Sequence, residues 1–158
     1  MAFKRDILTG DSKQKVAAAL QKVLVDLVDL SLQLKQAHWN VRGQHFRPLH
    51  LQLDEIVETT RSASDEVAER LATLGVAPDG RLATVSKSTS LEAYPPEFIG
   101  WQQTVTLVAD RLMAAIKRVR EAMGVAGEHD PVSEDLLIEV SSDLEQHLWM
   151  VQAQEETR

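Results

Sequence analysis

The sequence HWNVRGQHFRPLHLQLDEI, residues 38–56, spans the turn between two long helical segments. Apolar residues before it recur at steps of three and four positions, which predicts a helix over residues 12–40. Gly43 interrupts this pattern, and a second helix is predicted over residues 46–74, with Gly75 after its last turn. The predicted core positions of the two helices are Val16, Leu20, Val23, Leu27, Leu30, Leu34 and His38, then Leu49, Leu53, Ile56, Thr60, Val67, Leu71 and Leu74.

The rest of the chain predicts a second pair of helices. Residues 75–96 hold three of the five prolines and are predicted to form a loop, with a short helix around residues 91–94. A third helix is predicted over residues 97–123, and a fourth from Asp130 and Pro131 to about residue 153. The long connection lets the second and third helices run parallel. The pattern therefore predicts an all-α four-helix bundle, with the ferritin-like arrangement as one of several that fit. We expect one domain over residues 1–158, with a short arm over about residues 1–11.

Composition excludes several classes of protein. The chain of 158 residues carries a net charge of −7, so no whole-surface affinity for nucleic acid is expected. It contains no cysteine, which excludes disulfides, thiolate metal sites and cysteine nucleophiles. No apolar run is long enough to predict a membrane span, and residues 1–15 lack the apolar segment of a secretory signal. A cytoplasmic location is therefore expected.

The second helix carries a polar stripe in addition to its core stripe. His50 and Asp54 are four residues apart, as are Asp65 and Glu69. At about 100° per residue, the four side chains fall within roughly 100° of one another, and the core stripe lies elsewhere on the helix. Imidazole and carboxylate groups together form a mixed nitrogen and oxygen ligand set that suits non-haem iron and that zinc or manganese also accept.

A single straight helix cannot bring both pairs to one metal, because His50 and Asp65 are about 22 Å apart along its axis. Two copies placed antiparallel around a two-fold axis near the middle of the helix would set the histidine pair of one chain opposite the acidic pair of the other. A two-fold axis repeats every contact, which gives two equivalent sites per dimer. His38, at the end of the first helix, is placed to add a second imidazole.

Ordinary structural roles remain open for these residues. A lone histidine on an apolar stripe, such as His38, is usually packed in the core, and two acidic residues four apart usually lie on a solvated face. The internal two-metal centre of larger ferritins is disfavoured, since none of the five histidines has an acidic residue three positions before it. His45 follows the glycine turn and is assigned to a loop. His147, four residues after Asp143, resembles a site pair, although a structural hydrogen bond is its preferred role.

These motifs together resemble the Dps family of bacterial mini-ferritins. The family pattern consists of H-W-N-x-x-G, F-x-x-x-H-x-x-x-D and D-x-x-A-E-R. It is matched by His38, Trp39, Asn40 and Gly43, then Phe46, His50 and Asp54, then Asp65, Ala68, Glu69 and Arg70. The late segment DPVSEDLLIEVSSDLEQHLWM, residues 130–150, resembles the fourth helix of the family.

The resemblance implies a ferritin-like subunit that assembles into a hollow homododecamer. It implies a ferroxidase that oxidises Fe²⁺ to Fe³⁺, preferably with hydrogen peroxide, stores a ferric mineral inside the cage and so protects DNA from oxidative damage. The implied ligands of a di-iron site are His38, His50 and Asp54 from one subunit, with Asp65 and Glu69 from its two-fold mate.

Other residues have candidate roles around this site and in the cage wall. Trp39 adjoins the site and is a candidate radical sink, with packing as an equal alternative. Lys35 is a candidate for a salt bridge near the site, with a solvated lysine as the alternative. Asp130, Glu134 and Asp135 are candidates to line pores that draw cations inward. Helix capping explains Asp130 by itself, which favours Asp135 for the pore.

DNA compaction at the nucleoid is the alternative function, because many members of this family bind DNA through mobile tails rich in lysine and arginine. Residues 1–15 carry four basic residues against two aspartates, and the C-terminal QAQEETR carries two glutamates and one arginine. These tails depart from the pattern of strong binders, so DNA binding is expected to be weak or absent.

Overall fold

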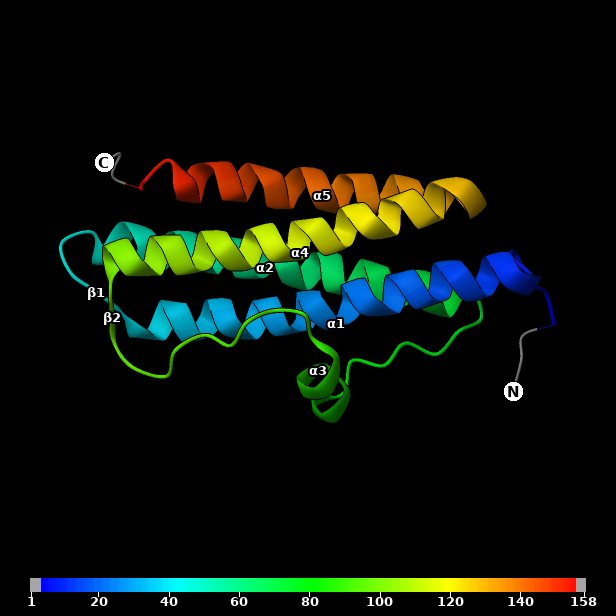
Figure 1. Ribbon diagram of the computed structural model, residues 1–158, viewed down its shortest axis with the longest axis horizontal. Coiled ribbons are helices and arrows are strands. Elements are labelled where there is room, and N and C mark those ends of the chain that lie inside the picture. Colours follow the sequence, from blue (N-terminus) through cyan, green and yellow to red (C-terminus); the bar gives the residue numbers. More distant parts are fainter. Residues whose placement is uncertain (1–3, 156–158) are drawn as a thin grey trace.

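The computed structural model describes residues 4–155, and in this range four long helices form a bundle, with a fifth, short helix beside it (Figure 1). The helices are α1 (Gly10–Asn40), α2 (Phe46–Thr73), α3 (Leu82–Ser88), α4 (Trp101–His129) and α5 (Pro131–Gln152). Two-residue strands, β1 (Val41–Arg42) and β2 (Ile99–Gly100), pair in parallel at one end of the bundle. The prediction of an all-α four-helix bundle with a short helix in a long crossover is confirmed.

The core of the bundle contains both of the stripes predicted for the first two helices. Every predicted core position on α1 and α2 is buried, including the polar His38 and Thr60. Thr60 satisfies its hydroxyl by donating to the carbonyl of Ile56 at 2.7 Å. Full burial of each leucine stabilises the fold by about 1.5–3 kcal/mol, so these two stripes account for much of the hydrophobic driving force.

The crossover between α2 and α4 returns the chain to the end of the bundle where α2 begins, so α2 and α4 run parallel (Figure 1). Side chains of α1 hold it in place. The Gln21 side-chain amide pairs with the backbone N–H and carbonyl of Asp79, both at 2.9 Å. The Asp26 carboxylate accepts the backbone N–H of Ser90 at 2.8 Å. The crossover is thus a docked segment.

The bounds predicted for two helices are wrong. The short helix of the crossover spans Leu82–Ser88 and not residues 91–94, because Val85 packs into the bundle while Ser90 is held by its bond to Asp26. The third long helix begins at Trp101 and not at residue 97, because Ile99 and Gly100 pair with β1 as a strand. This helix does not stop before Gly124 but continues to His129. Its buried side carries Ala126 beyond that point, and Gly124 lacks the positive φ that ends a helix.

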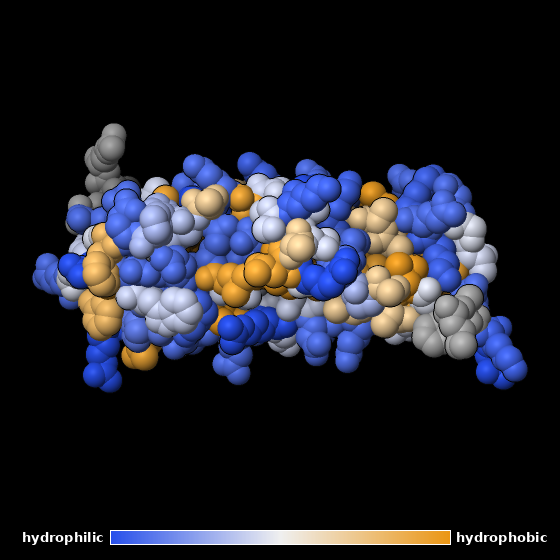
Figure 2. All heavy atoms as spheres, turned by 90° about the horizontal axis from the view of Figure 1, so that it is seen from below, coloured by the Kyte–Doolittle hydropathy of each residue, from blue (hydrophilic) through white to orange (hydrophobic). Residues whose placement is uncertain are grey.

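Hydrophobic side chains also gather on the surface that carries α1, α3 and the crossover, where Figure 2 shows them in the middle of the face. Leu32 of α1 is 48% exposed and Leu82 of α3 is 75% exposed. Exposed apolar patches of this kind commonly mark contact surfaces. None of the helices between residues 4 and 155 is long and apolar enough to cross a membrane.

Candidate metal centre

His38 and His50 lie face to face where the end of α1 meets the start of α2. Their rings are stacked, with centroids 3.6 Å apart and planes inclined by 21°. His38 Nδ1 lies 2.8 Å from the backbone carbonyl of His50, and His50 Nδ1 lies 2.9 Å from the backbone carbonyl of His38. A carbonyl only accepts, so each Nδ1 carries a proton and donates it. Each ring therefore keeps the lone pair of its Nε2 available for a metal ion.

Asp54 is held beside His38 by a salt bridge to Lys35, which was one of the two roles considered for that lysine. Lys35 donates to Asp54 Oδ1 at 2.6 Å, and the same oxygen lies 3.4 Å from His38 Nδ1. The hydrogen bond from Lys35 lowers the pKa of Asp54 below its ordinary value and outweighs the opposing effect of desolvation. The carboxylate of Asp54, a predicted ligand, is thereby kept ionised next to the imidazole of His38.

Asp65 and Glu69 do not reach these three residues within one subunit. Both are exposed on α2, more than three helical turns beyond Asp54. Among residues 4–155, no group of three histidine or acidic side chains is arranged to hold a metal ion. His38, His50 and Asp54 are neighbours within one chain but do not by themselves form such a group. Asp65 and Glu69 stay a predicted contribution from a second copy.

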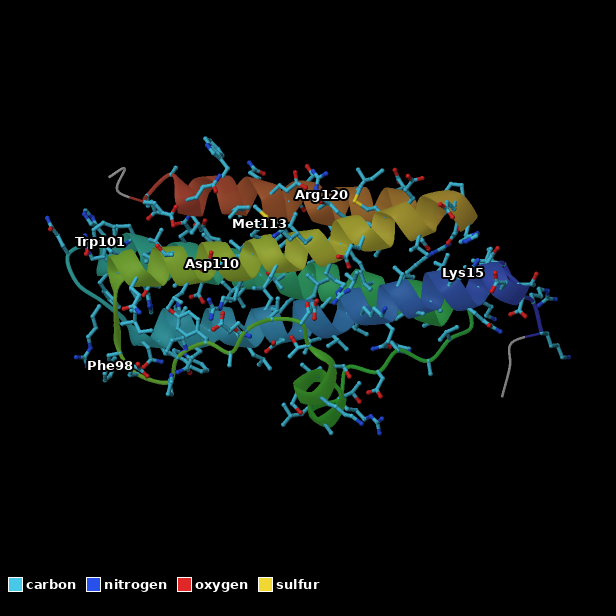
Figure 3. The ribbon with its side chains drawn as sticks, viewed as in Figure 1. Lys15, Phe98, Trp101, Asp110, Met113 and Arg120 are labelled. Carbon is cyan, nitrogen blue, oxygen red and sulfur yellow. The ribbon has the colours of Figure 1, made fainter. Side chains whose placement is uncertain are left out.

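Two aromatic neighbours of this region have different surroundings. Trp39 is 64% exposed, so it does not pack in the core of the subunit, and Lys35 Nζ lies 5.9 Å from the centre of its ring. His45 stands at the N-cap position of α2, with its ring edge-on to Trp101 at 4.5 Å. The turn that holds His45 is at the same end of the bundle as Phe98 and Trp101 (Figure 3). The assignment of His45 to a loop agrees with this position.

The three pore candidates lie at the start of α5 in unlike settings. Asp130 stands at the predicted N-cap position, but its side chain makes no capping hydrogen bond. Its carboxylate is buried and accepts hydrogen bonds from the side chains of Ser133 and, at 2.7 Å, Arg70. Glu134 is half-buried, with its carboxylate against Gly127 of α4. Asp135 is exposed. The Arg70 contact commits Asp130 to a role inside the subunit, and it was not predicted from the sequence.

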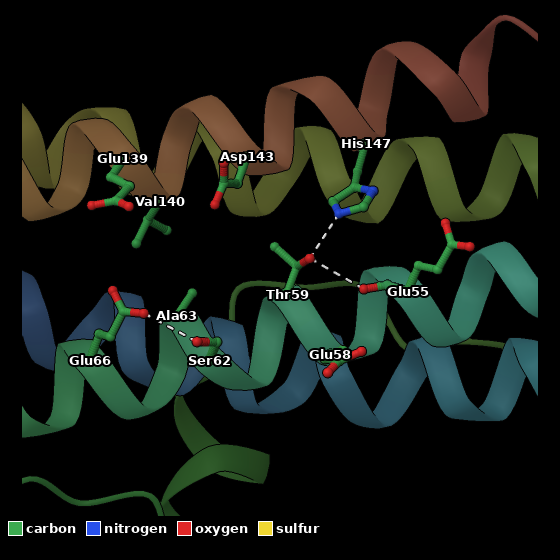
Figure 4. A pocket seen from close by; sticks show the side chains of 10 residues that line it. All are labelled: Glu55, Glu58, Thr59, Ser62, Ala63, Glu66, Glu139, Val140, Asp143 and His147. Carbon is green, nitrogen blue, oxygen red and sulfur yellow. Dashed lines mark hydrogen bonds between the residues drawn. The ribbon is translucent and has the colours of Figure 1, made fainter.

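His147 makes the structural hydrogen bond that was its preferred role. The Thr59 hydroxyl donates to the carbonyl of Glu55 and is bonded to His147 Nε2 at 2.9 Å, which joins α2 to α5 (Figure 4). Burial lowers the pKa of His147, against the opposing influence of Asp143 and Glu55. This histidine is therefore neutral at pH 7, with its ring fixed between the helices.

Comparison with known proteins identifies the family. A model of the ferritin-like domain matches residues 17–157. The DNA protection during starvation protein of Agrobacterium fabrum is 32% identical over 147 residues, which cover 92% of this chain and 91% of that protein. The chain belongs to the ferritin-like Dps family. Members of this family are mini-ferritins that store iron and protect DNA.

Solved structures of Dps proteins have the same fold. A structure of Mycobacterium smegmatis Dps superimposes with a TM-score of 0.93 at 35% identity, covering 99% of this chain and 95% of that one. Another relative, 38% identical over 146 residues, is the fine tangled pili major subunit of Haemophilus ducreyi. The match covers 92% of this chain and 77% of that protein.

Proposed function

We propose that this Dps-family chain is a ferroxidase whose di-iron site is shared between two subunits. Its ligands are His38, His50 and Asp54 of one subunit, with Asp65 and Glu69 of the partner subunit. Iron is the substrate of this site, and zinc or manganese also fits the same set of nitrogen and oxygen ligands. The cage formed by twelve such subunits would hold the ferric product.

The observation that carries the proposal is the pair of hydrogen bonds from the two Nδ1 groups to backbone carbonyls. Metal-binding histidines usually donate their second ring nitrogen to a carbonyl or carboxylate, which fixes the tautomer and the orientation of the ring. A histidine that served only as core packing would not need a second histidine beside it whose Nδ1 is also bonded to a backbone carbonyl. Asp54, kept ionised by Lys35, adds a negative charge that favours bound cations.

The proposed reaction transfers one electron from each of two Fe²⁺ ions to one molecule of hydrogen peroxide. The peroxide O–O bond breaks, and with two protons the two oxygen atoms leave as water. A pair of iron ions supplies both electrons together, which limits release of the hydroxyl radical that a single electron would produce. The residues of the chain bind and orient the ions, and Trp39, exposed beside Lys35, is the proposed sink for stray radicals.

The remaining parts of the proposal concern the cage and DNA. Glu134 and Asp135 are the proposed lining of the pores through which iron enters, since Asp130 is paired with Arg70.

DNA compaction is the weaker alternative. Of the four basic residues in the first fifteen, Lys13 is paired with Asp6 and Lys15 with Asp11, which leaves less positive charge for phosphate groups.

The decisive experiment replaces both acidic ligands of the partner side, Asp65→Ala with Glu69→Ala, and follows oxidation of Fe²⁺ by peroxide at low iron loading. We expect the fast phase to disappear while the cage still assembles. Glu58→Ala with Glu66→Ala is the matched control, since it removes two carboxylates of the same helix outside the ligand set. Unchanged oxidation kinetics in the ligand variant would contradict the proposed site.

A further inference from the structure

Arg70 joins the C-terminal half of α2 to the start of α5 through two hydrogen bonds. Its Nε donates to the Ser133 hydroxyl at 2.9 Å and its Nη2 donates to Asp130 at 2.7 Å. Ser133 also donates to the same carboxylate oxygen. The side chains of Arg70 and Asp130 are only 10% and 9% exposed, so this contact is largely shielded from solvent and salt. We call Arg70, Asp130 and Ser133 the clamp.

Next to the clamp, α2 and α5 face each other with like charges. A pocket of about 400 Å³ between them is lined by three glutamates of α2 and two acidic residues of α5: Glu55, Glu58, Glu66, Glu139 and Asp143. Figure 4 shows acidic side chains of the two helices extending into this gap from opposite sides. The described residues that line the pocket include no lysine or arginine. Like charges on the two helices oppose their close approach. Solvent and salt screen this repulsion, because all five side chains are exposed.

Polar contacts hold α2 and α5 together inside the acidic pocket, which Thr59 and His147 themselves line, and on both sides of it. Toward the end of α5, Gln154 donates to Gln52 at 2.7 Å and His147 is bonded to Thr59 at 2.9 Å. Toward the start of α5, the clamp is the ion-paired contact. Asp65 and Glu69 lie on the part of α2 between Thr59 and Arg70. Glu69 is closer along the helix to the clamp than to the contact made by Thr59.

We propose that Arg70, held by Asp130 and Ser133, is the positioning residue that fixes the acidic ligand pair, Asp65 and Glu69, for the partner subunit. Arg70 follows Glu69 directly in the helix, so its side chain leaves α2 about 100° away from that of Glu69. Fixing the guanidinium against α5 fixes the rotation of the last turns of α2, and the ligand pair faces away from the bundle. The inference rests on the proposed function, because it concerns ligands of the proposed site.

The test measures metal binding without oxidation, by titrating assembled cages with Co²⁺ and following its visible absorption. We expect Arg70→Gln to lower the Co²⁺ affinity of the site at least tenfold. Arg120→Gln is the matched control, since Arg120 forms a two-point ion pair with Glu145 between α4 and α5 (Figure 3) but does not contact α2. It should change the affinity less than twofold. Equal affinities in wild type and Arg70→Gln overturn the inference.

A rescue variant separates positioning from general damage. Glu139→Gln with Asp143→Asn neutralises the α5 side of the pocket, which reduces the repulsion that the clamp opposes. Added to Arg70→Gln, this pair should restore most of the lost affinity, and in the wild-type background it should have little effect. Loss of affinity without recovery in the triple variant also overturns the inference.

Two further variants keep the outcome interpretable. If Arg70→Gln does not assemble, Arg70→Lys takes its place. Lysine keeps the positive charge but cannot donate to Ser133 and Asp130 from two separate nitrogens. Unchanged Co²⁺ affinity in Arg70→Lys overturns the inference. Asp65→Asn with Glu69→Gln reports on the proposed site itself. If that double variant retains full affinity, the proposed function fails. If it loses affinity while Arg70→Gln does not, only the clamp fails.

Discussion

His38 and His50 are joined through each other's backbone, because the Nδ1 of each donates to the carbonyl of the other. The two residues belong to different helices, so the contact also fixes the angle at which α1 and α2 meet. Replacing one side chain leaves its backbone carbonyl in place. The other ring therefore keeps its hydrogen bond and its orientation.

We expect His38→Ala and His50→Ala each to remove one of the two metal ions of the proposed site and to leave the other bound. The reason is that each variant loses one Nε2 ligand but retains the acceptor that orients the remaining ring. Titration with Zn²⁺ by calorimetry measures the stoichiometry. Loss of both ions from either single variant would contradict independent orientation of the two rings.

Mixed assembly tests whether the site is shared. A chain with His38→Ala and His50→Ala and a chain with Asp65→Ala and Glu69→Ala should each be inactive alone. Cages refolded from equal amounts of both should regain about a quarter of the wild-type oxidation rate, because half of the dimers are mixed and each restores one of its two sites. Each parent variant refolded alone is the control. No recovery in the mixture would show that the ligands are not divided between subunits in this way.

Asp130→Asn should destabilise the subunit in a pH-dependent manner. Burial tends to raise the pKa of Asp130, but hydrogen bonds from Ser133 and Arg70 outweigh it and lower the pKa below the ordinary value. The ionised carboxylate therefore stabilises the fold above about pH 4, and this contribution is lost as the pH falls through the lowered pKa.

Thermal unfolding of wild type and Asp130→Asn measures that difference. At pH 7 we expect a loss of about 3 kcal/mol, since the variant leaves Arg70 buried without its counter-charge. The two proteins should approach each other in stability as Asp130 becomes protonated in acid. Asp110→Asn, on the exposed face of α4, is the control and should be nearly neutral (Figure 3). A difference that stays constant down to acid pH would refute the role of the charge.

Gly43→Ala should destabilise the turn between α1 and α2 by about 2 kcal/mol or more. Gly43 has a φ of 116°, and a Cβ there would lie 2.8 Å from Cδ1 of Trp101. Gly124→Ala is the contrasting variant, because nothing lies within 4 Å of its Cβ position and alanine favours a helix interior by about 1 kcal/mol. Chemical denaturation should therefore show opposite shifts for the two variants.

The periodic parts of the fold could be predicted from the sequence. The stripes from Val16 to His38 and from Leu49 to Leu74 predicted both buried faces correctly. Apolar residues that recur every three or four positions over that length indicate a helix with one buried face. Gly75 was also assigned correctly to the position that follows the C-cap of α2, and it has a φ of 74°. The boundaries that failed depend on contacts between distant residues. Ser90 is held by Asp26, which no local pattern of residues 82–94 reveals.

The candidate site, too, could be predicted only in part. The histidine half was predicted from spacing, and the fold places His38, His50 and Asp54 together. Lys35 could be suggested only as one of two alternatives, because its pairing with Asp54 depends on how α1 and α2 pack. The clamp was missed altogether. Arg70 and Asp130 are sixty residues apart in sequence, and neither lies in a pattern that names the other as its partner.

The crossover divides the chain into two helical hairpins, α1 with α2 and α4 with α5, that pack side by side (Figure 1). All five proposed ligands lie on the first hairpin, between His38 and Glu69. The second hairpin carries none of these ligands. It can alter the proposed iron chemistry through the pore candidates Glu134 and Asp135, and through the clamp residues Asp130 and Ser133 that hold Arg70 of α2. Directed evolution of the second hairpin, with Asp130 and Ser133 kept constant, should therefore leave all five proposed ligands and their support in place.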